Sequence, residues 1–103
     1  MARFYTRRIG METWLQQDDC VILRHGNLLL GFCERPETDC AGTITFFYDS
    51  REDVDAMHGN LVDIATTQPA TNDKYRIYQF FARDPEGRIL EFQHFLHPVN
   101  PVA

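Results

Sequence analysis

Short runs of alternating apolar and polar residues dominate this chain, and turn-forming residues separate them. The clearest case is FFARDPEGRILEFQ at residues 80–93. Phe80 to Ala82 favour a strand, Asp84 to Gly87 are typical of a type I turn, and residues 88–95 begin a second strand. Because side chains alternate faces along a strand, Glu91 is expected on one face and His94 on the other. The pattern predicts a β-hairpin that carries one carboxylate in a mostly apolar setting.

The same analysis predicts the other elements. The first half contains a helix over residues 2–9 with Gly10 as its C-cap, and strands over 13–17, 20–24 and 28–33. Gly26-Asn27 is a hairpin signal between the last two strands, and residues 34–41 are expected to form a polar linker. The second half contains a strand over 43–48 and a helix that runs to about Ile64, with Asp49 and Ser50 as its N-cap candidates. A short extended segment and the hairpin follow.

The two halves partly repeat. The second reads strand, helix, then two or three strands, whereas the first reads helix, then three strands. If both are copies of one βαβββ unit, the first copy lacks its opening strand, and one sheet edge is left open. Two hypotheses follow: Met1 is internal to a longer gene product, or a partner chain covers the edge.

Composition limits the classes of protein. A chain of 103 residues with 44% hydrophobic and 24% charged residues is expected to form one domain, or two small and closely packed modules, with a real core. The net charge of −5 argues against nucleic acid or an anionic membrane as a partner. Because no apolar run approaches the roughly 20 residues of a spanning helix, and no signal peptide is evident, a cytoplasmic location is expected.

The chain has three cysteines, Cys20, Cys33 and Cys40. Their number is odd, and no two of them form a CxxC pair. Reduced thiols are therefore expected rather than a structural disulfide or a zinc cluster.

Three segments together resemble the vicinal-oxygen-chelate superfamily, which includes glyoxalases, bleomycin-resistance proteins and extradiol dioxygenases. They are FYTRRIGM at 4–11, GTITFFYD at 42–49 and FFARDPEGRILEF at 80–92. The resemblance implies an α+β fold of two βαβββ modules, residues 1–41 and 42–103, whose strands form a curved mixed sheet around a ligand cavity. It also implies a homodimer.

The resemblance further implies a possible divalent metal such as Zn, Mn, Fe or Ni. Glu91 falls on the closing-strand glutamate that ligates metal in the family's enzymes, whereas Thr43 falls where a histidine is common. The ligand of the first module's opening strand has no counterpart, and residues 31–34 offer a poor fourth position. A firmly held catalytic metal needs about three protein ligands, so the sequence supplies too few.

Two classes of function remain open. One is a small-molecule-binding protein without a complete metal site, and the other is a metal-dependent lyase or dioxygenase that uses Glu91. Aromatic residues are candidates for the walls of a ligand site, with core packing as the alternative: Trp14, Phe46, Tyr78 and Phe80. The histidines are expected to have other roles, at the surface (His25), packed beside the second helix (His58), on the face opposite Glu91 (His94) and in the tail (His97).

Overall fold

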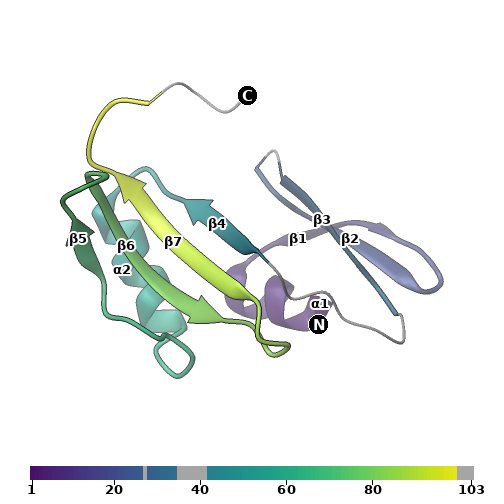
Figure 1. The fold of residues 1–103 in the computed structure, drawn as a ribbon. Helices are drawn as coiled ribbons and strands as arrows, with labels where there is room; N and C mark the ends of the chain where they lie inside the picture. Colours follow the sequence, from purple (N-terminus) through teal and green to yellow (C-terminus); the bar gives the residue numbers. More distant parts are fainter. Residues whose placement is uncertain (27, 35–41, 100–103) are drawn as a thin grey trace. The chain divides into compact units, whose positions relative to one another are not determined.

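The computed structural model describes residues 1–26, 28–34 and 42–99. They form two compact α+β units, one within residues 1–34 and one within residues 42–99 (Figure 1). Each unit has its own sheet, as the near-repeat in the sequence predicts. Asn27, most of the predicted linker and Cys40 lie outside the described residues.

The first unit opens with a short helix and continues as an antiparallel sheet. Its elements are α1 (Ala2–Phe4), the π-helical turn η1 (Tyr5–Ile9), β1 (Glu12–Gln16), β2 (Cys20–His25) and β3 (Leu28–Cys33), with strand order β1-β2-β3. The helical segment ends at Gly10, whose φ of 90° is the left-handed conformation that glycine adopts without strain. The buried Tyr5 ring packs 4.8 Å from the Phe32 ring and ties this segment to β3.

The expectation that the cysteines are reduced is wrong for two of them. Cys20 and Cys33 are directly paired across β2 and β3 and form a disulfide. The next pair outward carries a backbone hydrogen bond from Glu34 N–H to Asp19 O at 2.9 Å. Cys20 and Cys33 therefore occupy a non-hydrogen-bonded pair, where the side chains of opposite residues come closest.

The second unit contains a mixed four-stranded sheet with a helix on one face. Its elements are β4 (Thr43–Phe47), α2 (Arg51–Asn60), β5 (Ala70–Asn72), β6 (Ile77–Arg83) and β7 (Ile89–Phe95). The strand order is β4-β7-β6-β5, with β4 parallel to β7 and the other pairs antiparallel. The first unit has three strands and the second has four, so the missing opening strand of the first repeat is confirmed for the described residues.

The core of the second unit lies between the sheet and α2. The Phe92 ring of β7 stacks on Phe46 at 5.4 Å and on Phe80 at 4.9 Å. Val54 and Leu61 close this core from the helix side, and both are fully buried. Burial of such side chains stabilises the unit by about 1.5–3 kcal/mol each, which explains why the apolar face of the sheet is turned to α2.

Helix α2 begins where the sequence predicts and ends earlier. The Ser50 hydroxyl accepts a hydrogen bond from Asp53 N–H at 3.1 Å, so Ser50 is the N-cap of the two candidates. The helix ends at Asn60 rather than near Ile64, because Leu61 leaves the helical conformation with φ −120°. The backbone N–H groups of Ile64 and Ala65 then both bond to Leu61 O, so the apolar period continues through a turn instead of a helix.

The predicted hairpin is confirmed. Its β-turn is closed by Gly87 N–H, which donates to Asp84 O at 2.9 Å. The Asp84 side chain is fully buried and accepts hydrogen bonds from the backbone N–H groups of Glu86 and Arg88 and from the Arg88 guanidinium. No helix within the described residues is long and apolar enough to cross a membrane.

Candidate functional site

One face of the second unit's sheet is not covered by α2, and we call it the open face. In Figure 1 it is turned toward the viewer, with α2 behind the strands. The register places Thr45, Glu91 and Phe81 in one row across β4, β7 and β6. The next row contains Phe47, Gln93 and Gln79. Because faces alternate along strands, both rows point away from the buried Phe46, Phe80 and Phe92.

Glu91 is held on the open face by its neighbour on β4. The Thr45 hydroxyl donates a hydrogen bond of 2.8 Å to Glu91 Oε1. Thr43, the position that the resemblance selected, pairs with Ile89 instead. The residue beside Glu91 is therefore Thr45. Thr43 and Thr45 lie on the same face because side chains alternate along a strand. Which of them lies beside Glu91 depends on the register of two parallel strands, and tertiary structure sets that register because the paired residues are 46 apart in the sequence.

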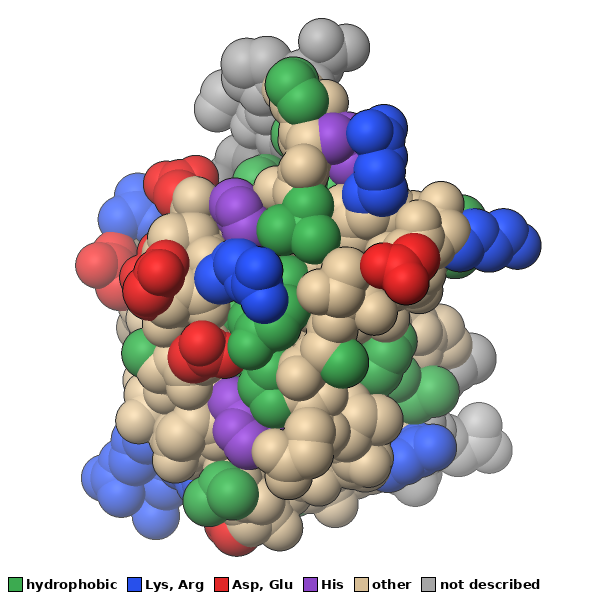
Figure 2. Space-filling model, turned by 90° about the vertical axis from the view of Figure 1, so that its left-hand side faces the viewer, with side chains coloured by type: hydrophobic (Ala, Val, Ile, Leu, Met, Phe, Trp, Pro, Cys, Tyr) green, Lys and Arg blue, Asp and Glu red, His purple; other side chains and the backbone are tan. Residues whose placement is uncertain are grey.

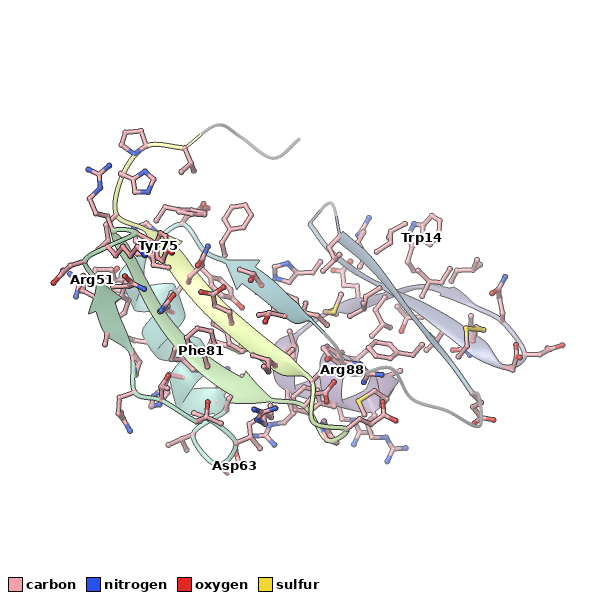
Figure 3. All side chains as sticks on the ribbon, in the orientation of Figure 1. Trp14, Arg51, Asp63, Tyr75, Phe81 and Arg88 are labelled. Atoms are coloured by element: carbon pink, nitrogen blue, oxygen red, sulfur yellow. A yellow bond between two sulfur atoms is a disulfide. The ribbon has the colours of Figure 1, made fainter. Side chains whose placement is uncertain are left out.

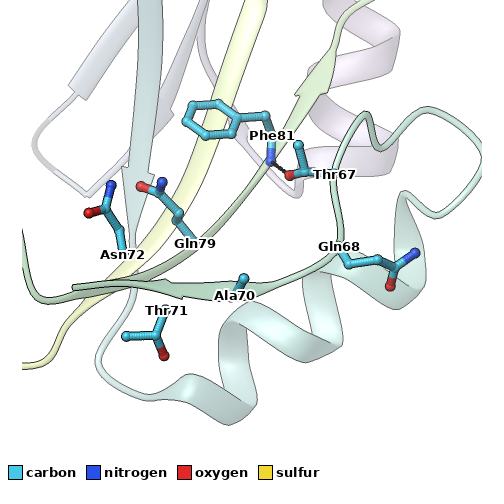
Figure 4. Close-up of a pocket in the computed structure, with 7 residues that line it drawn as sticks. All are labelled: Thr67, Gln68, Ala70, Thr71, Asn72, Gln79 and Phe81. Atoms are coloured by element: carbon cyan, nitrogen blue, oxygen red, sulfur yellow. Dashed lines mark hydrogen bonds between the residues drawn. The ribbon is translucent and has the colours of Figure 1, made fainter. Parts of the chain in front are cut away.

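A pocket of about 290 Å³ lies at the β5 and β6 end of this unit (Figure 4). The segment 67–72 forms one wall, and Gln79 and Phe81 of β6 form the other. None of the described residues that line it carries a charge. Thr67 Oγ1 accepts a hydrogen bond from Phe81 N–H at 2.9 Å, which fixes the segment before β5 against β6.

The residues that line this pocket include three with carboxamide side chains, Gln68, Asn72 and Gln79. Asn72 Oδ1 accepts hydrogen bonds from Lys74 N–H at 3.1 Å and Tyr75 N–H at 3.3 Å. Gln79 Oε1 is buried and has no hydrogen-bond partner among the described residues. In Figure 4 the side chains of Asn72, Gln79 and Phe81 extend to the same side of the two strands. Asn72, Gln79 and Phe81 were not predicted as site residues, although Gln79 and Phe81 alternate along β6 with Phe80, which was a candidate.

Solved structures similar to this chain share one fold. A glyoxalase/bleomycin resistance protein/dioxygenase family enzyme from Burkholderia phytofirmans PsJN is 18% identical, covers 93% of this chain and 88% of its own, and has a TM-score of 0.80. Lactoylglutathione lyase from Agrobacterium tumefaciens is 19% identical and has a TM-score of 0.72. The match covers 90% of this chain and 81% of the lyase chain. No family model matches the sequence, and no curated protein sequence matches it.

This chain has the glyoxalase/bleomycin resistance/dioxygenase fold. The resemblance seen in the sequence is therefore confirmed at the level of the fold. Identities below 20% leave the ligand and the chemistry to be argued from this chain's own residues.

The metal site expected from the glyoxalase/bleomycin resistance/dioxygenase fold does not fit the donor set found here. Within residues 1–26, 28–34 and 42–99 there is no group of three or more His, Cys, Asp or Glu side chains placed to hold a metal ion. Glu91 accepts a hydrogen bond from the Thr45 hydroxyl, and a threonine hydroxyl is a poor metal ligand. We therefore derive no chemical step through a metal.

The histidines of the second unit make other contacts. His94 Nδ1 lies 2.9 Å from Tyr48 O, on the face opposite Glu91 as predicted. The His58 ring packs edge-on against Phe80 at 5.0 Å, so it is the packing histidine that the sequence indicates. His97 Nδ1 lies 3.1 Å from Pro98 O, after the end of β7.

Of the four aromatic residues selected from the sequence, three belong to the second unit and one to the first. Phe46 and Phe80 are 1% and 0% exposed and pack in the core. Tyr78 is on the same face, where its hydroxyl donates to Asp55 Oδ1 at 2.5 Å and Arg51 lies 4.4 Å from its ring centre. The hydrogen bond to Asp55 is the largest cause that raises the pKa of Tyr78. Trp14 belongs to the first unit and is 54% exposed (Figure 3).

The outer surface beside β5 carries mixed charge. Figure 2 views the molecule from this side, and hydrophobic side chains form a narrow strip there. Lys and Arg side chains stand singly on this face among acidic and uncharged ones. The expectation that nucleic acid is not a partner stays a prediction.

Proposed function

We propose that this protein is a small-molecule-binding protein whose ligand occupies the pocket between the segment 67–72 and β6. The observation that carries the proposal is Gln79 Oε1, a buried acceptor in the pocket wall with no hydrogen-bond partner among the described residues. A buried polar atom without a partner costs about 1–3 kcal/mol, and a ligand that donates a hydrogen bond there removes this cost.

The size of the pocket supports a small ligand. Its volume of about 290 Å³ is just below the range of about 300–1,000 Å³ for sites that bind drug-sized molecules. Phe81 lines the pocket and is also paired with Glu91 across β6 and β7. The Thr45 hydroxyl holds Glu91 in place, which supports a binding role for this face.

A fragment titration followed by NMR tests this proposal. The protein would be labelled with ¹⁵N and titrated with a panel of small uncharged aromatic and amide compounds. We expect some of them to shift the resonances of Asn72, Gln79 and Phe81 in a saturable way. If every binding compound shifts only residues of the α2 face, or if none binds, the proposed function is wrong.

Metal analysis separates this function from the metal-dependent lyase or dioxygenase. The protein would be incubated with Zn²⁺, Mn²⁺, Fe²⁺ or Ni²⁺, desalted and analysed by plasma mass spectrometry. We expect no metal at a stoichiometric level in the wild type. One metal ion per chain that is lost in Glu91→Ala and retained in the control Glu52→Ala would favour the enzyme instead.

The homodimer expected from the resemblance stays a prediction. Sedimentation velocity at micromolar concentration would check it, and a stable monomer would count against it.

A further inference from the structure

We infer that the pocket recognises a carboxamide or lactam group joined to a planar apolar ring. This inference rests on the proposed function, because it specifies the chemical class of the ligand at the same site. Three features of the pocket carry it: an unpaired polar atom on Gln79, the way Asn72 is held, and the combination of Phe81 with uncharged walls.

Gln79 requires a hydrogen-bonding partner from the ligand. Its Oε1 atom is buried in the pocket wall and has no partner among the described residues. As a carbonyl oxygen, it accepts an N–H or O–H donor. A carboxamide ligand also suits the opposite orientation of the Gln79 amide, because a carboxamide carries both an N–H donor and a carbonyl acceptor.

Asn72 is held in one orientation by the chain itself. Its Oδ1 atom already accepts from Lys74 N–H and Tyr75 N–H in the turn after β5. The side-chain amide therefore has its Nδ2 hydrogens left to offer, and these need an acceptor. Because Asn72 and Gln79 extend to the same side of β5 and β6 (Figure 4), one ligand group can meet both. The group must then donate to Gln79 and accept from Asn72.

The charge and shape of the pocket select among groups that donate and accept. A carboxylate has no donor, and the described lining residues include no Lys or Arg to neutralise it. An ammonium has no acceptor, and the lining residues include no Asp or Glu. Phe81 supplies an aromatic side chain for a planar apolar ring to pack against. An aromatic carboxamide or lactam meets these requirements within about 290 Å³.

Three ligands of nearly equal size test the inference on the wild-type protein. Benzamide has the ring, the donor and the acceptor, methyl benzoate lacks the donor, and benzoate lacks the donor and is charged. We expect benzamide to bind about tenfold more tightly than methyl benzoate, as expected for one buried hydrogen bond, and benzoate to bind most weakly. Dissociation constants would come from ¹⁵N shifts of the pocket residues.

A pair of variants assigns the preference to Gln79. Gln79→Leu removes the carboxamide at similar size, and we expect it to abolish the difference between benzamide and methyl benzoate. Gln16→Leu makes the same chemical change at an exposed position of β1 and should leave the difference intact. The amide shift dispersion of each variant shows whether it is folded.

The outcomes separate this inference from the proposed function. If compounds bind the pocket but methyl benzoate binds as tightly as benzamide, the carboxamide inference is wrong and the binding function stands. If Gln79→Leu keeps a tenfold preference, the assignment to Gln79 is wrong. If no compound in either panel binds, the proposed function fails as well.

Discussion

The hydroxyl of Thr45 donates a hydrogen bond of 2.8 Å to the carboxylate of Glu91 across two parallel strands. It joins β4 and β7, which are the first and last strands of the second unit in chain order. The carboxylate that the sequence offered as a metal ligand therefore has a partner within its own sheet.

Thr45→Val tests the strength of this contact. The substitution keeps the shape of the side chain and removes the donor. Because Glu91 is only half-buried, we expect the free energy of unfolding to fall by about 0.5–1 kcal/mol. Urea denaturation would measure it.

The matched control for Thr45→Val is Thr43→Val on the same strand and the same face. Thr43 is exposed and pairs with Ile89, so this change should alter stability by less than about 0.5 kcal/mol. Equal effects at both positions would show that the Glu91 contact adds nothing.

The Cys20–Cys33 disulfide is expected to stabilise the β2–β3 hairpin. It closes a segment with a sequence separation of 13, and cross-links of this length stabilise by about 3 kcal/mol through loss of chain entropy in the unfolded state. Reduction should lower the free energy of unfolding by about 2–3 kcal/mol in urea. The measurement is best made in Cys40→Ser, so that Cys20 and Cys33 are the only cysteines.

A thiol assay controls the disulfide experiment. The unfolded Cys40→Ser protein should show no free thiol before reduction and two per chain after it. Two free thiols in protein purified without reductant would contradict the disulfide.

Asp84 is expected to be the most sensitive position of the β6–β7 turn. Asp84→Ala removes the acceptor of two backbone N–H groups and of the Arg88 guanidinium, so we expect a loss of about 2–3 kcal/mol. Glu86→Ala, the control, removes only the more exposed carboxylate that contacts Arg88. It should cost less than about 1 kcal/mol. A larger loss in Glu86→Ala than in Asp84→Ala would overturn this ranking.

Tyr48 makes stability depend on alkaline pH. Burial, and secondly the Asp53 carboxylate, raises the pKa of Tyr48 to about 12 from the ordinary value of 10.0. Between pH 10 and pH 12 the unfolded chain loses this proton while the folded chain keeps it, so stability falls as pH rises in this window and is unaffected by Tyr48 below it.

Tyr48→Phe provides the check for this pH dependence. The free energy of unfolding from pH 9 to pH 11 should decline less steeply in the variant than in the wild type. In an alkaline titration followed by tyrosinate absorbance, the variant should lack the step that occurs at the highest pH in the wild type. Identical slopes for the two proteins would show that the Tyr48 hydroxyl ionises normally.

Local chemistry made several elements predictable from the sequence. Ser50 caps α2, Gly10 ends the first helical segment, and Asp84 organises its turn, because each acts on backbone groups a few residues away. The alternation of β7 likewise separated Glu91 from His94 correctly. The sequence did not predict features that depend on strand register or on packing. Examples are the residue beside Glu91 and the end of α2.

The disulfide is an instructive miss, because its signal was in the sequence. The hairpin signal at Gly26-Asn27 predicts that His25 pairs with Leu28, and the two are paired. Counting outward from that pair places Cys20 directly opposite Cys33. Cysteine spacing alone does not show this, whereas the hairpin register does. The pocket at Gln79 carried no comparable signal, since a buried acceptor is recognised only once its neighbours are placed.

The parallel pairing of β4 with β7 has a consequence for synthesis on the ribosome. Strand β7 lies between β4 and β6, so the sheet of the second unit cannot close until β7 has left the exit tunnel. The hydrogen bond from Thr45 to Glu91 can form only after Glu91 has been synthesised, 46 residues further along the chain. Until then β4 exposes an unpaired edge, and such nascent edges are prone to misassociation. The first unit, whose strands pair only with chain neighbours, can form its sheet as soon as β3 emerges.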